Sequence, residues 1–217
     1  MSLNKKLSNH VPHAKLSGKI WNDDMTMKKE IRDKLLDISD AFTDYIGIPL
    51  DVLDVTVTGS YANYNYTPYS DIDLHIIVDY DSLTDVEDLP KEFFNAKKSF
   101  WNDRHDIKIK GIEVELYAQN EKEEHSSTGV YSVDRDEWIV KPKKFKDELD
   151  LKSIIKKYRK IKKDIDESIK SAKKEKDIKT VEKIIEKIRK MRKSGLEKAG
   201  EMSDENLVYK LLRSNNI

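Results

Sequence analysis

The sequence has no cysteine, which excludes a disulfide framework, a zinc site built from thiolates and a cysteine nucleophile. It has no apolar run long enough to span a bilayer, and its N-terminal region lacks the apolar core of a signal peptide. Charged residues make up 38% of the chain and hydrophobic residues 37%, which predicts a very polar surface over a modest core. We therefore expect a soluble, cytoplasmic protein that does not contact membranes.

Net charge is absent from the whole chain but not from its two parts. Lys and Arg number 41, and Asp and Glu also number 41. Residues 1–150 contain 20 basic and 30 acidic side chains, whereas residues 151–217 contain 21 basic and 11 acidic ones. This asymmetry predicts two functional parts. The acidic part suits metal binding, and the basic part suits either a polyanion or docking on the acidic part.

The pattern of apolar residues also changes near residue 146. Residues 1–20 have no period and predict a loose N-terminal arm. From about residue 147 the apolar residues recur with helical spacing, which predicts a hairpin of two helices and a short last helix capped by Ser203. We predict a mixed α/β domain over residues 1–146, with the arm at its start, and an all-helical C-terminal annex over residues 147–217.

Within the α/β domain, helices and short strands alternate. Asp23 or Asp24 is expected to cap the first helix, which Gly47 ends. Gly111 marks either a bulge or a turn between two short strands. The expected helices cover about 24–46 and 90–104, and the expected strands lie near 55–58, 71–79, 106–110, 112–118, 130–133 and 138–140.

Residues 55–79 are the most informative stretch, because they contain two strands joined by a loop rich in Tyr and Asn. The first strand ends at Gly59-Ser60, and the second carries Asp71 and Asp73. Alternate residues of a strand share a face, so these carboxylates lie about 7 Å apart on one side of the sheet. Like charges held side by side repel each other, so the pair predicts a bound divalent cation.

A later strand adds two more carboxylates on one face, Glu113 and Glu115. If the strands are neighbours in one sheet, three or four carboxylates point into one site. That number suits two Mg²⁺ ions, and the Gly59-Ser60 turn suits a phosphate beside them. In the alternative interpretation all four acids lie on a solvated sheet face, where neighbouring like charges are destabilising.

This arrangement resembles the DNA polymerase β-like nucleotidyltransferase superfamily. That family has an apolar residue followed by Gly-Ser, then Asp-x-Asp between apolar residues, and later an acid inside an apolar strand. The matching segments here are Thr58-Gly59-Ser60, Ser70-Asp71-Ile72-Asp73-Leu74 and Val114-Glu115-Leu116. Thr58 departs from the pattern, because it is only partly apolar. The resemblance covers roughly residues 24–118 and implies a mixed-sheet nucleotidyltransferase fold.

The resemblance also implies an enzyme. It would move a nucleoside monophosphate from a nucleoside triphosphate (NTP) to an acceptor hydroxyl and release pyrophosphate, with two Mg²⁺ ions, or Mn²⁺ in their place. Gly59 and Ser60 would hold the triphosphate, and Asp71 and Asp73 would bind both metals.

The third carboxylate would bind the metal that activates the acceptor hydroxyl, or act as its base. Glu115 is the preferred candidate, because Leu116-Tyr117 continues its strand as in the family, and Glu113 is the competing one. His75 continues the face of the aspartates, where it orients a carboxylate, contacts substrate or makes a structural hydrogen bond.

The resemblance leaves the nucleotide, the acceptor and the oligomeric state open. An RNA 3′ end would use the basic residues of the helical annex, Lys156, Lys157, Arg159, Lys160, Lys162 and Lys163. The resemblance also implies that a basic residue of the annex meets the triphosphate, with Lys156, Lys157 and Lys160 as the candidates. A small molecule or a second nucleotide would need a closed pocket, and a protein side chain is another option. The tyrosines of the loop either stack on a base or pack against the first helix. The alternative function is a catalytically degenerate interaction module that binds a protein or nucleic-acid partner.

Overall fold

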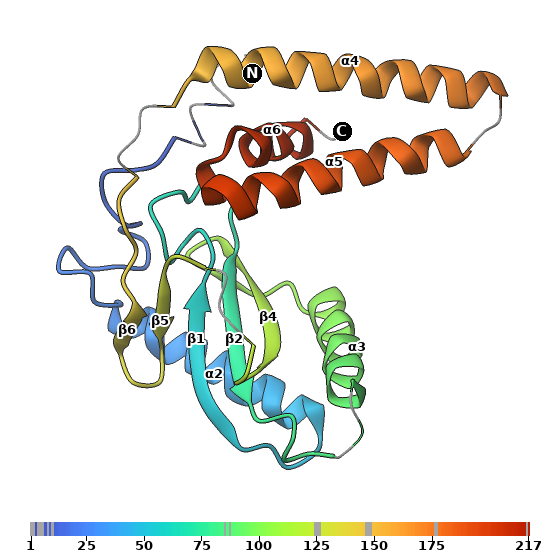
Figure 1. Ribbon diagram of the computed structural model, residues 1–217. Coiled ribbons are helices and arrows are strands. Elements are labelled where there is room, and N and C mark those ends of the chain that lie inside the picture. The colour runs from blue at the N-terminus through green and yellow to red at the C-terminus, as the bar shows by residue number, and fades with distance from the viewer. Residues whose placement is uncertain are drawn as a thin grey trace. The chain divides into compact units, whose positions relative to one another are not determined.

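The computed structural model describes Leu3, Leu7 and Asn9 and residues 11–84, 86, 88–123, 127–145, 149–175, 178–215 and 217. The chain folds as two units. One is Pro12–Lys144, and the other combines Met1–Val11 with Phe145–Ile217. The first unit is mixed α/β and the second is helical, as the sequence predicts (Figure 1).

A six-stranded mixed sheet forms the centre of the first unit, with the strand order β3-β4-β2-β1-β5-β6. β2 runs parallel to β4, and all other neighbouring strands are antiparallel. The parallel pair needs a crossover, which contains the helix α3. The strands are β1 (Val52–Thr58), β2 (Ile72–Val78), β3 (Lys108–Ile109), β4 (Ile112–Asn120), β5 (Val130–Ser132) and β6 (Glu137–Val140).

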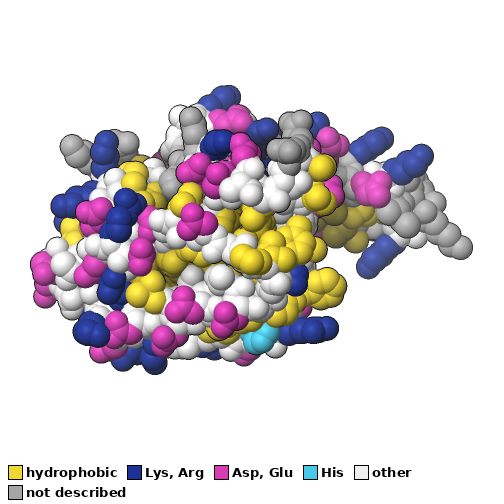
Figure 2. Space-filling model, turned by 90° about the horizontal axis from the view of Figure 1, so that it is seen from below, with side chains coloured by type: hydrophobic (Ala, Val, Ile, Leu, Met, Phe, Trp, Pro, Cys, Tyr) yellow, Lys and Arg dark blue, Asp and Glu magenta, His cyan; other side chains and the backbone are white. Residues whose placement is uncertain are grey.

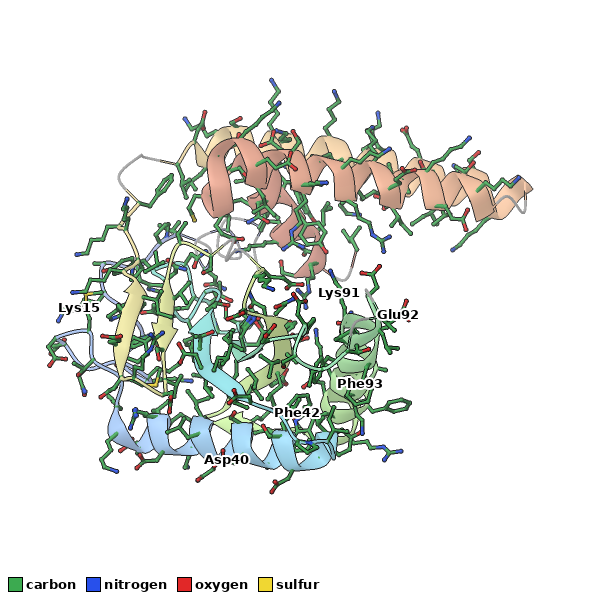
Figure 3. The ribbon with its side chains drawn as sticks, turned by 60° about the horizontal axis from the view of Figure 1, so that its bottom comes forward. Lys15, Asp40, Phe42, Lys91, Glu92 and Phe93 are labelled. Atoms are coloured by element: carbon green, nitrogen blue, oxygen red, sulfur yellow. The ribbon has the colours of Figure 1, made fainter. Side chains whose placement is uncertain are left out.

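Two helices, α2 (Lys29–Ile46) and α3 (Leu89–Arg104), pack against the sheet and against each other. The rings of Phe42 in α2 and Trp101 in α3 meet edge to face, with centroids 5.4 Å apart. Phe42 points from α2 toward the sheet and Asp40 points away from it (Figure 3). The apolar stripe of α2 therefore buries one face of the sheet.

The molecular face in Figure 2 has acidic and basic side chains interspersed with apolar ones.

The first helix begins later than the sequence predicts, at Lys29 rather than near residue 24. Asp24 does not cap it. The Asp24 carboxylate accepts hydrogen bonds from the backbone N–H and the hydroxyl of Thr26, at 3.0 and 2.7 Å. Met25 has a φ of 69°, which is incompatible with a helix. The predicted end is confirmed, because Gly47 follows the helix with a φ of 76°.

The turn between β3 and β4 explains why Gly111 interrupts the apolar pattern. Lys110 and Gly111 both have positive φ, 52° and 76°. Two successive positive φ angles are typical of a two-residue hairpin turn of type I′. The turn interpretation of Gly111 is therefore confirmed, and the bulge interpretation is wrong.

The second unit contains the predicted helical hairpin and last helix. Its elements are α4 (Leu151–Glu175), α5 (Ile178–Ala199), a 3₁₀ turn (Gly200–Met202) and α6 (Asp204–Arg213). The Ser203 hydroxyl accepts a hydrogen bond from the Asn206 N–H, so the predicted cap of α6 is confirmed. Of the described helices, none combines the length and the apolarity needed to cross a membrane.

The core of the helical unit includes a residue from the start of the chain. Leu7 is 1% exposed and belongs to the same buried cluster as Ile154, Tyr158 and Leu211. Ile20 is fully buried in the core of the α/β unit. The prediction of a loose arm over residues 1–20 is therefore wrong for these residues, because each of them is held in a core.

Candidate active site

The strand register brings three polar side chains of different strands into one row. Asp73 in β2 lies between Thr58 of β1 and Glu115 of β4. Neighbouring strands are about 4.8 Å apart, so the carboxylates of Asp73 and Glu115 start from adjacent backbone positions on one face. Leu74 and Leu116, next along the same strands, are fully buried. The register shows that β2 and β4 are neighbours in the sheet, which is the condition for their carboxylates to share one site.

Glu113 has a different environment from Glu115. It is the register partner of Lys108 in β3, and its carboxylate lies 3.5 Å from the Lys108 ammonium group. The Glu113 side chain is 69% exposed, whereas that of Glu115 is 37% exposed. The register thus pairs Glu115, and not Glu113, with Asp73.

Gly59 lies directly against the Asp73 carboxylate. It has a φ of 70°, and a Cβ added to it would lie 1.7 Å from Asp73 Oδ2. Any side chain at this position would therefore displace the carboxylate or the turn. The positive φ favours glycine here, and the close approach means that a side chain would push the Asp73 carboxylate aside. This contact explains the glycine of the Gly-Ser motif. It brings the Gly59-Ser60 backbone to the edge of the row formed by Thr58, Asp73 and Glu115, which we call the carboxylate row.

A hydrogen-bonded clamp fixes the direction of the Gly59-Ser60 peptide. The Asn63 side-chain amide donates to the Gly59 carbonyl oxygen at 3.0 Å, and its oxygen accepts from the Thr128 hydroxyl at 3.0 Å. The Asn63 side chain is buried. Because the C=O and N–H of one peptide point in opposite directions, the Ser60 N–H points away from Asn63.

The segment after the clamp residue Thr128 lies close to the loop that follows the turn. A Cβ added to Gly129 would lie 2.1 Å from the carbonyl oxygen of Ala62. The Ser127 hydroxyl donates to the Gly129 carbonyl oxygen at 2.8 Å, which holds this segment in shape. Two parts of the chain more than 60 residues apart therefore support one turn.

His75 makes structural hydrogen bonds within the sheet. Its Nδ1 lies 2.7 Å from Gln119 Oε1, and its Nε2 lies 3.1 Å from the Thr58 hydroxyl. An amide oxygen only accepts, so Nδ1 donates to Gln119. The imidazole also stacks on the Tyr117 ring, with centroids 4.8 Å apart. His75 thus holds Thr58 and Tyr117, the residues that flank the carboxylate row.

Lys98 of α3 neutralises the third carboxylate. Its ammonium nitrogen lies 3.6 Å from Glu115 Oε1 and 3.5 Å from the centroid of the Tyr117 ring. Only about a quarter of the Lys98 side chain is exposed, so water screens this pair less than a surface ion pair. The Lys98 ammonium group therefore supplies a positive charge at the Glu115 end of the row.

Tyr117 reports how the three predicted acids are grouped. Burial raises the pKa of its hydroxyl, a hydrogen bond to Glu115 raises it further, and the charges of Glu115, Asp73 and Asp71 add to the effect. All three carboxylates therefore lie within electrostatic range of one hydroxyl.

Asp71 precedes β2 and lies at the rim of a pocket. The pocket has a volume of about 350 Å³ and is also lined by Glu113, Glu115 and residues 102–107, which include the end of α3 and the segment that follows it. Asn102 joins α3 to β4, because its amide donates to the Leu116 carbonyl oxygen at 3.2 Å and its oxygen accepts from the Leu116 N–H at 3.3 Å. The pocket therefore opens beside two of the three predicted acids.

The carboxylate row has the donor chemistry of a site for a hard divalent cation. Carboxylate oxygens are the ligands that Mg²⁺ and Mn²⁺ prefer, and the Gly59 backbone lies where a side chain would block Asp73. Among the described residues, however, no three Asp, Glu or His side chains are already close enough to hold a metal ion together. Glu115 is instead paired with Lys98. For Glu115 to bind a metal ion, that ion would have to replace the Lys98 ammonium group.

The tyrosines of the loop between β1 and β2 divide into packed and exposed ones. Tyr61 and Tyr64 are buried in the core, and Tyr66 stacks on His13 with centroids 3.9 Å apart. These contacts confirm that the loop packs, although the ring contacts of Tyr66 come from the segment before α2 and from Tyr61. Tyr69 is 71% exposed and lies two residues before Asp71. It remains the loop tyrosine available to stack on a base.

The clamp residues and Lys98 escape sequence reasoning for different reasons. An Asn four residues after a turn glycine is a local signal that points to a turn. Thr128 and Lys98 give no such signal, because their contacts depend on the sheet order and on the packing of α3. Tyr117 can be found, since it lies two residues after Glu115 and alternate strand residues share a face.

Comparison with known proteins gives one match. A family model described as a nucleotidyltransferase domain matches residues 29–200, which is most of the chain and includes the whole carboxylate row. No curated protein and no solved structure matches the chain significantly.

Proposed function

Because the chain belongs to the nucleotidyltransferase domain family, we propose that it moves a nucleoside monophosphate from an NTP to an acceptor hydroxyl and releases pyrophosphate. Family membership supports nucleotidyl transfer in general. The observation that carries the specific proposal is the row Thr58–Asp73–Glu115 beside Gly59. It combines acidic oxygens with a half-buried turn of the backbone, as metal-dependent phosphate chemistry requires.

The Gly59-Ser60 turn is proposed to hold the triphosphate. The Ser60 N–H points away from Asn63, and the Ser60 hydroxyl supplies a second donor. Since Gly59 has no side chain, a phosphate can approach the backbone beside Asp73. The clamp by Asn63 and Thr128 fixes this peptide before a ligand arrives, which lowers the entropic cost of binding.

Asp71, Asp73 and Glu115 are proposed to hold the divalent cations, two Mg²⁺ ions or Mn²⁺ in their place. When bound, such ions stabilise negative charge on the attacking and leaving oxygens. When no metal ion is bound, the Lys98 ammonium group balances the charge of Glu115. Lys98 thereby prevents the repulsion that an unpaired Glu115 would exert on Asp73.

In the proposed reaction, the acceptor oxygen forms a bond to the α-phosphorus. The bond from the α-phosphorus to the oxygen that bridges to the β-phosphorus breaks, and pyrophosphate leaves with that oxygen. The acceptor proton passes to the Glu115 carboxylate, which accepts it as a base. The ion pair with Lys98 restricts where Glu115 can lie.

The division of labour between the parts of the chain is a further element of the proposal. The α/β part up to residue 146 is proposed to carry catalysis, and the helical annex from residue 147 to contribute to partner binding. The acceptor is an RNA end, a small hydroxyl compound, a second nucleotide or a protein side chain, and the pocket beside Asp71 suits the small compounds.

The test is transfer of label from NTPs that carry a labelled α-phosphate. The full chain is incubated with each of the four NTPs, Mg²⁺ and a panel of acceptors from these classes. We expect transfer to at least one acceptor, and we expect the combined variant Asp71→Asn/Asp73→Asn to lower it by at least about 1,000-fold, because the variant removes two carboxylate charges.

Asp40→Asn is the matched control, because Asp40 is an exposed carboxylate on α2 far from the row in sequence. It is expected to leave transfer unchanged. Transfer by the double variant at the parent rate contradicts the proposal. If the parent protein neither binds nor transfers any nucleotide but forms a stable complex with a partner, the chain is the degenerate interaction module instead.

A further inference from the structure

The first three turns of α4 carry an unusual concentration of positive charge. Residues 151–163 contain seven Lys and Arg side chains and no acidic one. The buried residues of this stretch, Ile154 and Tyr158, face the core of the helical unit. Four of the cations are exposed and have no acidic partner within ion-pair distance among the described residues. They are Lys152, Lys156, Arg159 and Lys160, which we call the α4 stripe.

Helical geometry puts the α4 stripe on one face. Residues three, four and seven apart in a helix lie on the same side, so the four side chains span a narrow sector opposite Ile154 and Tyr158. The sector extends over about 12 Å of helix axis, since each residue adds about 1.5 Å. A nucleic-acid duplex carries about seven phosphate charges over that length. The density of cations on the stripe is therefore of the same order as that of the phosphates.

The charges elsewhere in the same hairpin are arranged differently. There, several lysines are paired with acids one turn away on the same helix, as in Lys162–Asp166, Lys163–Glu167 and Lys190–Glu186. In the α4 stripe, by contrast, Lys156 has Lys152 and Lys160 at the same spacing. Like charges four residues apart destabilise a helix, and so do cations in its first turn. The stripe thus works against the stability of α4, which local helix formation does not explain.

We propose that the α4 stripe binds the phosphate backbone of a nucleic acid. A polyanion removes the repulsion among the four cations and releases its own counterions, so binding turns the unfavourable charge pattern into affinity. The stripe has no exposed aromatic ring, because Tyr158 is buried. Base stacking is therefore not part of this surface, and binding is expected to be independent of sequence.

Two other classes of partner fit the stripe less well. A helix that lies on a membrane exposes an apolar face to the lipid. The apolar residues Ile154 and Tyr158 of α4 are instead buried in the core of the unit. A specific protein interface has an apolar or aromatic centre, which a row of lysines does not supply. Charge complementarity therefore favours a nucleic acid. The inference does not depend on the proposed transfer reaction.

Binding of short labelled RNA, as a single strand and as a duplex, tests the proposal without nucleotide or metal. We expect the full chain to bind both forms. For four phosphate contacts, the logarithm of the binding constant should fall with the logarithm of salt concentration with a slope of about −3 to −4. The stripe variant, with Lys152, Lys156, Arg159 and Lys160 all changed to Gln, should lose at least about 100-fold in affinity at low salt and most of that slope.

A variant with the same loss of charge serves as control. It changes Lys162, Lys187, Lys190 and Lys193 to Gln, four lysines that have acidic partners in the hairpin. This control should bind RNA within about 3-fold of the parent, because the lysines it removes are already neutralised. Circular dichroism checks that both variants keep their helices.

Three results overturn the proposal. The first is an equal loss of affinity in the stripe and control variants, which would indicate net charge alone. The second is a parent protein that does not bind RNA at low salt. The third is a stripe-dependent binding to phosphatidylserine vesicles while RNA binding is unchanged in the stripe variant, which would assign the surface to a membrane.

Discussion

At the residue scale, the Asn63 side chain controls the peptide that is proposed to meet the triphosphate. Its amide donates to the Gly59 carbonyl, and its oxygen accepts from Thr128. The Asn63 side chain is buried, so each bond lost leaves one of its polar groups without a partner. The direction of the Ser60 N–H therefore depends on a side chain that does not itself contact the nucleotide.

Asn63→Asp tests this dependence with almost no change of shape. The carboxylate can still accept from Thr128 but cannot donate to Gly59, and it repels the Gly59 carbonyl oxygen. We expect affinity for a non-hydrolysable NTP with Mg²⁺ to fall by at least about 10-fold, measured by calorimetry. Thr128→Val is the comparison, because it keeps the bond to Gly59 and should cost less affinity. Unchanged affinity in a folded Asn63→Asp protein contradicts the positioning role.

Gly59→Ala tests the close approach to Asp73. A methyl group there would meet the carboxylate at 1.7 Å, and the φ of 70° is unfavourable for alanine. We expect nucleotide binding to be lost and the free energy of unfolding to fall by about 1–3 kcal/mol. Gly111→Ala shares the positive φ, 76°, but has open space around it. Gly111→Ala should therefore lower the stability but leave nucleotide affinity unchanged. Equal nucleotide affinities of the two variants would show that the contact with Asp73 does not cause the loss of binding.

Lys98→Met tests the competition for Glu115. Loss of the ammonium group leaves Glu115 without its cation. We expect Mn²⁺, followed by electron paramagnetic resonance without nucleotide, to bind about 3- to 10-fold more tightly. Lys97→Met is the control, because Lys97 lies over the rings of Tyr45 and Phe93 instead. Weaker Mn²⁺ binding to Lys98→Met than to Lys97→Met would contradict the exchange of cations at Glu115.

At the scale of elements, repulsion among the cations of the α4 stripe lowers the stability of α4. Lys156→Glu converts two repulsive contacts, with Lys152 and Lys160, into attractive ones. We expect it to raise the free energy of unfolding of the helical unit by about 0.5–1 kcal/mol in urea, while RNA affinity falls. Lys190→Glu should do the reverse for stability, because it places a second acid beside Glu186. A lower stability of Lys156→Glu than of the parent would show that repulsion among the stripe cations does not destabilise α4.

The elements themselves follow largely from local patterns in the sequence. Alternation finds the strands around Asp73 and Glu115, and the spacing of apolar residues finds the helices, because both periods are local. The start of α2 is misread, since Asp24 is a good cap in sequence but the positive φ of Met25 puts it in a turn. The shape of that turn depends on neighbours that a propensity argument does not include.

The site follows from the sequence only in part, for the same reason. Gly59, Asp71 and Asp73 lie in one short stretch, where a turn and a strand period suffice. The choice between Glu113 and Glu115 needs the register of β2 against β4, which period alone does not fix. The contact of Thr128 with Asn63 spans 65 residues and is decided by the tertiary structure.

At the scale of the whole molecule, the charge asymmetry of the sequence has a structural counterpart. The acidic part forms the α/β unit with the carboxylate row, and the basic part forms the helical unit with the α4 stripe. Leu7 shows what the sequence does not reveal, because this residue near the start of the chain is buried among helices from its end. Truncation of the N-terminal segment is therefore expected to weaken the helical unit.

The central claim is that Asp71 and Asp73, beside the Gly59 turn, form a site for a nucleotide with its divalent cation. Calorimetric titration of a non-hydrolysable NTP, with and without Mg²⁺, tests it most directly. The account predicts that the parent binds only with Mg²⁺, that Asp71→Asn/Asp73→Asn does not bind, and that Asp40→Asn binds like the parent. Equal, Mg²⁺-independent binding by the parent and the double variant would contradict it.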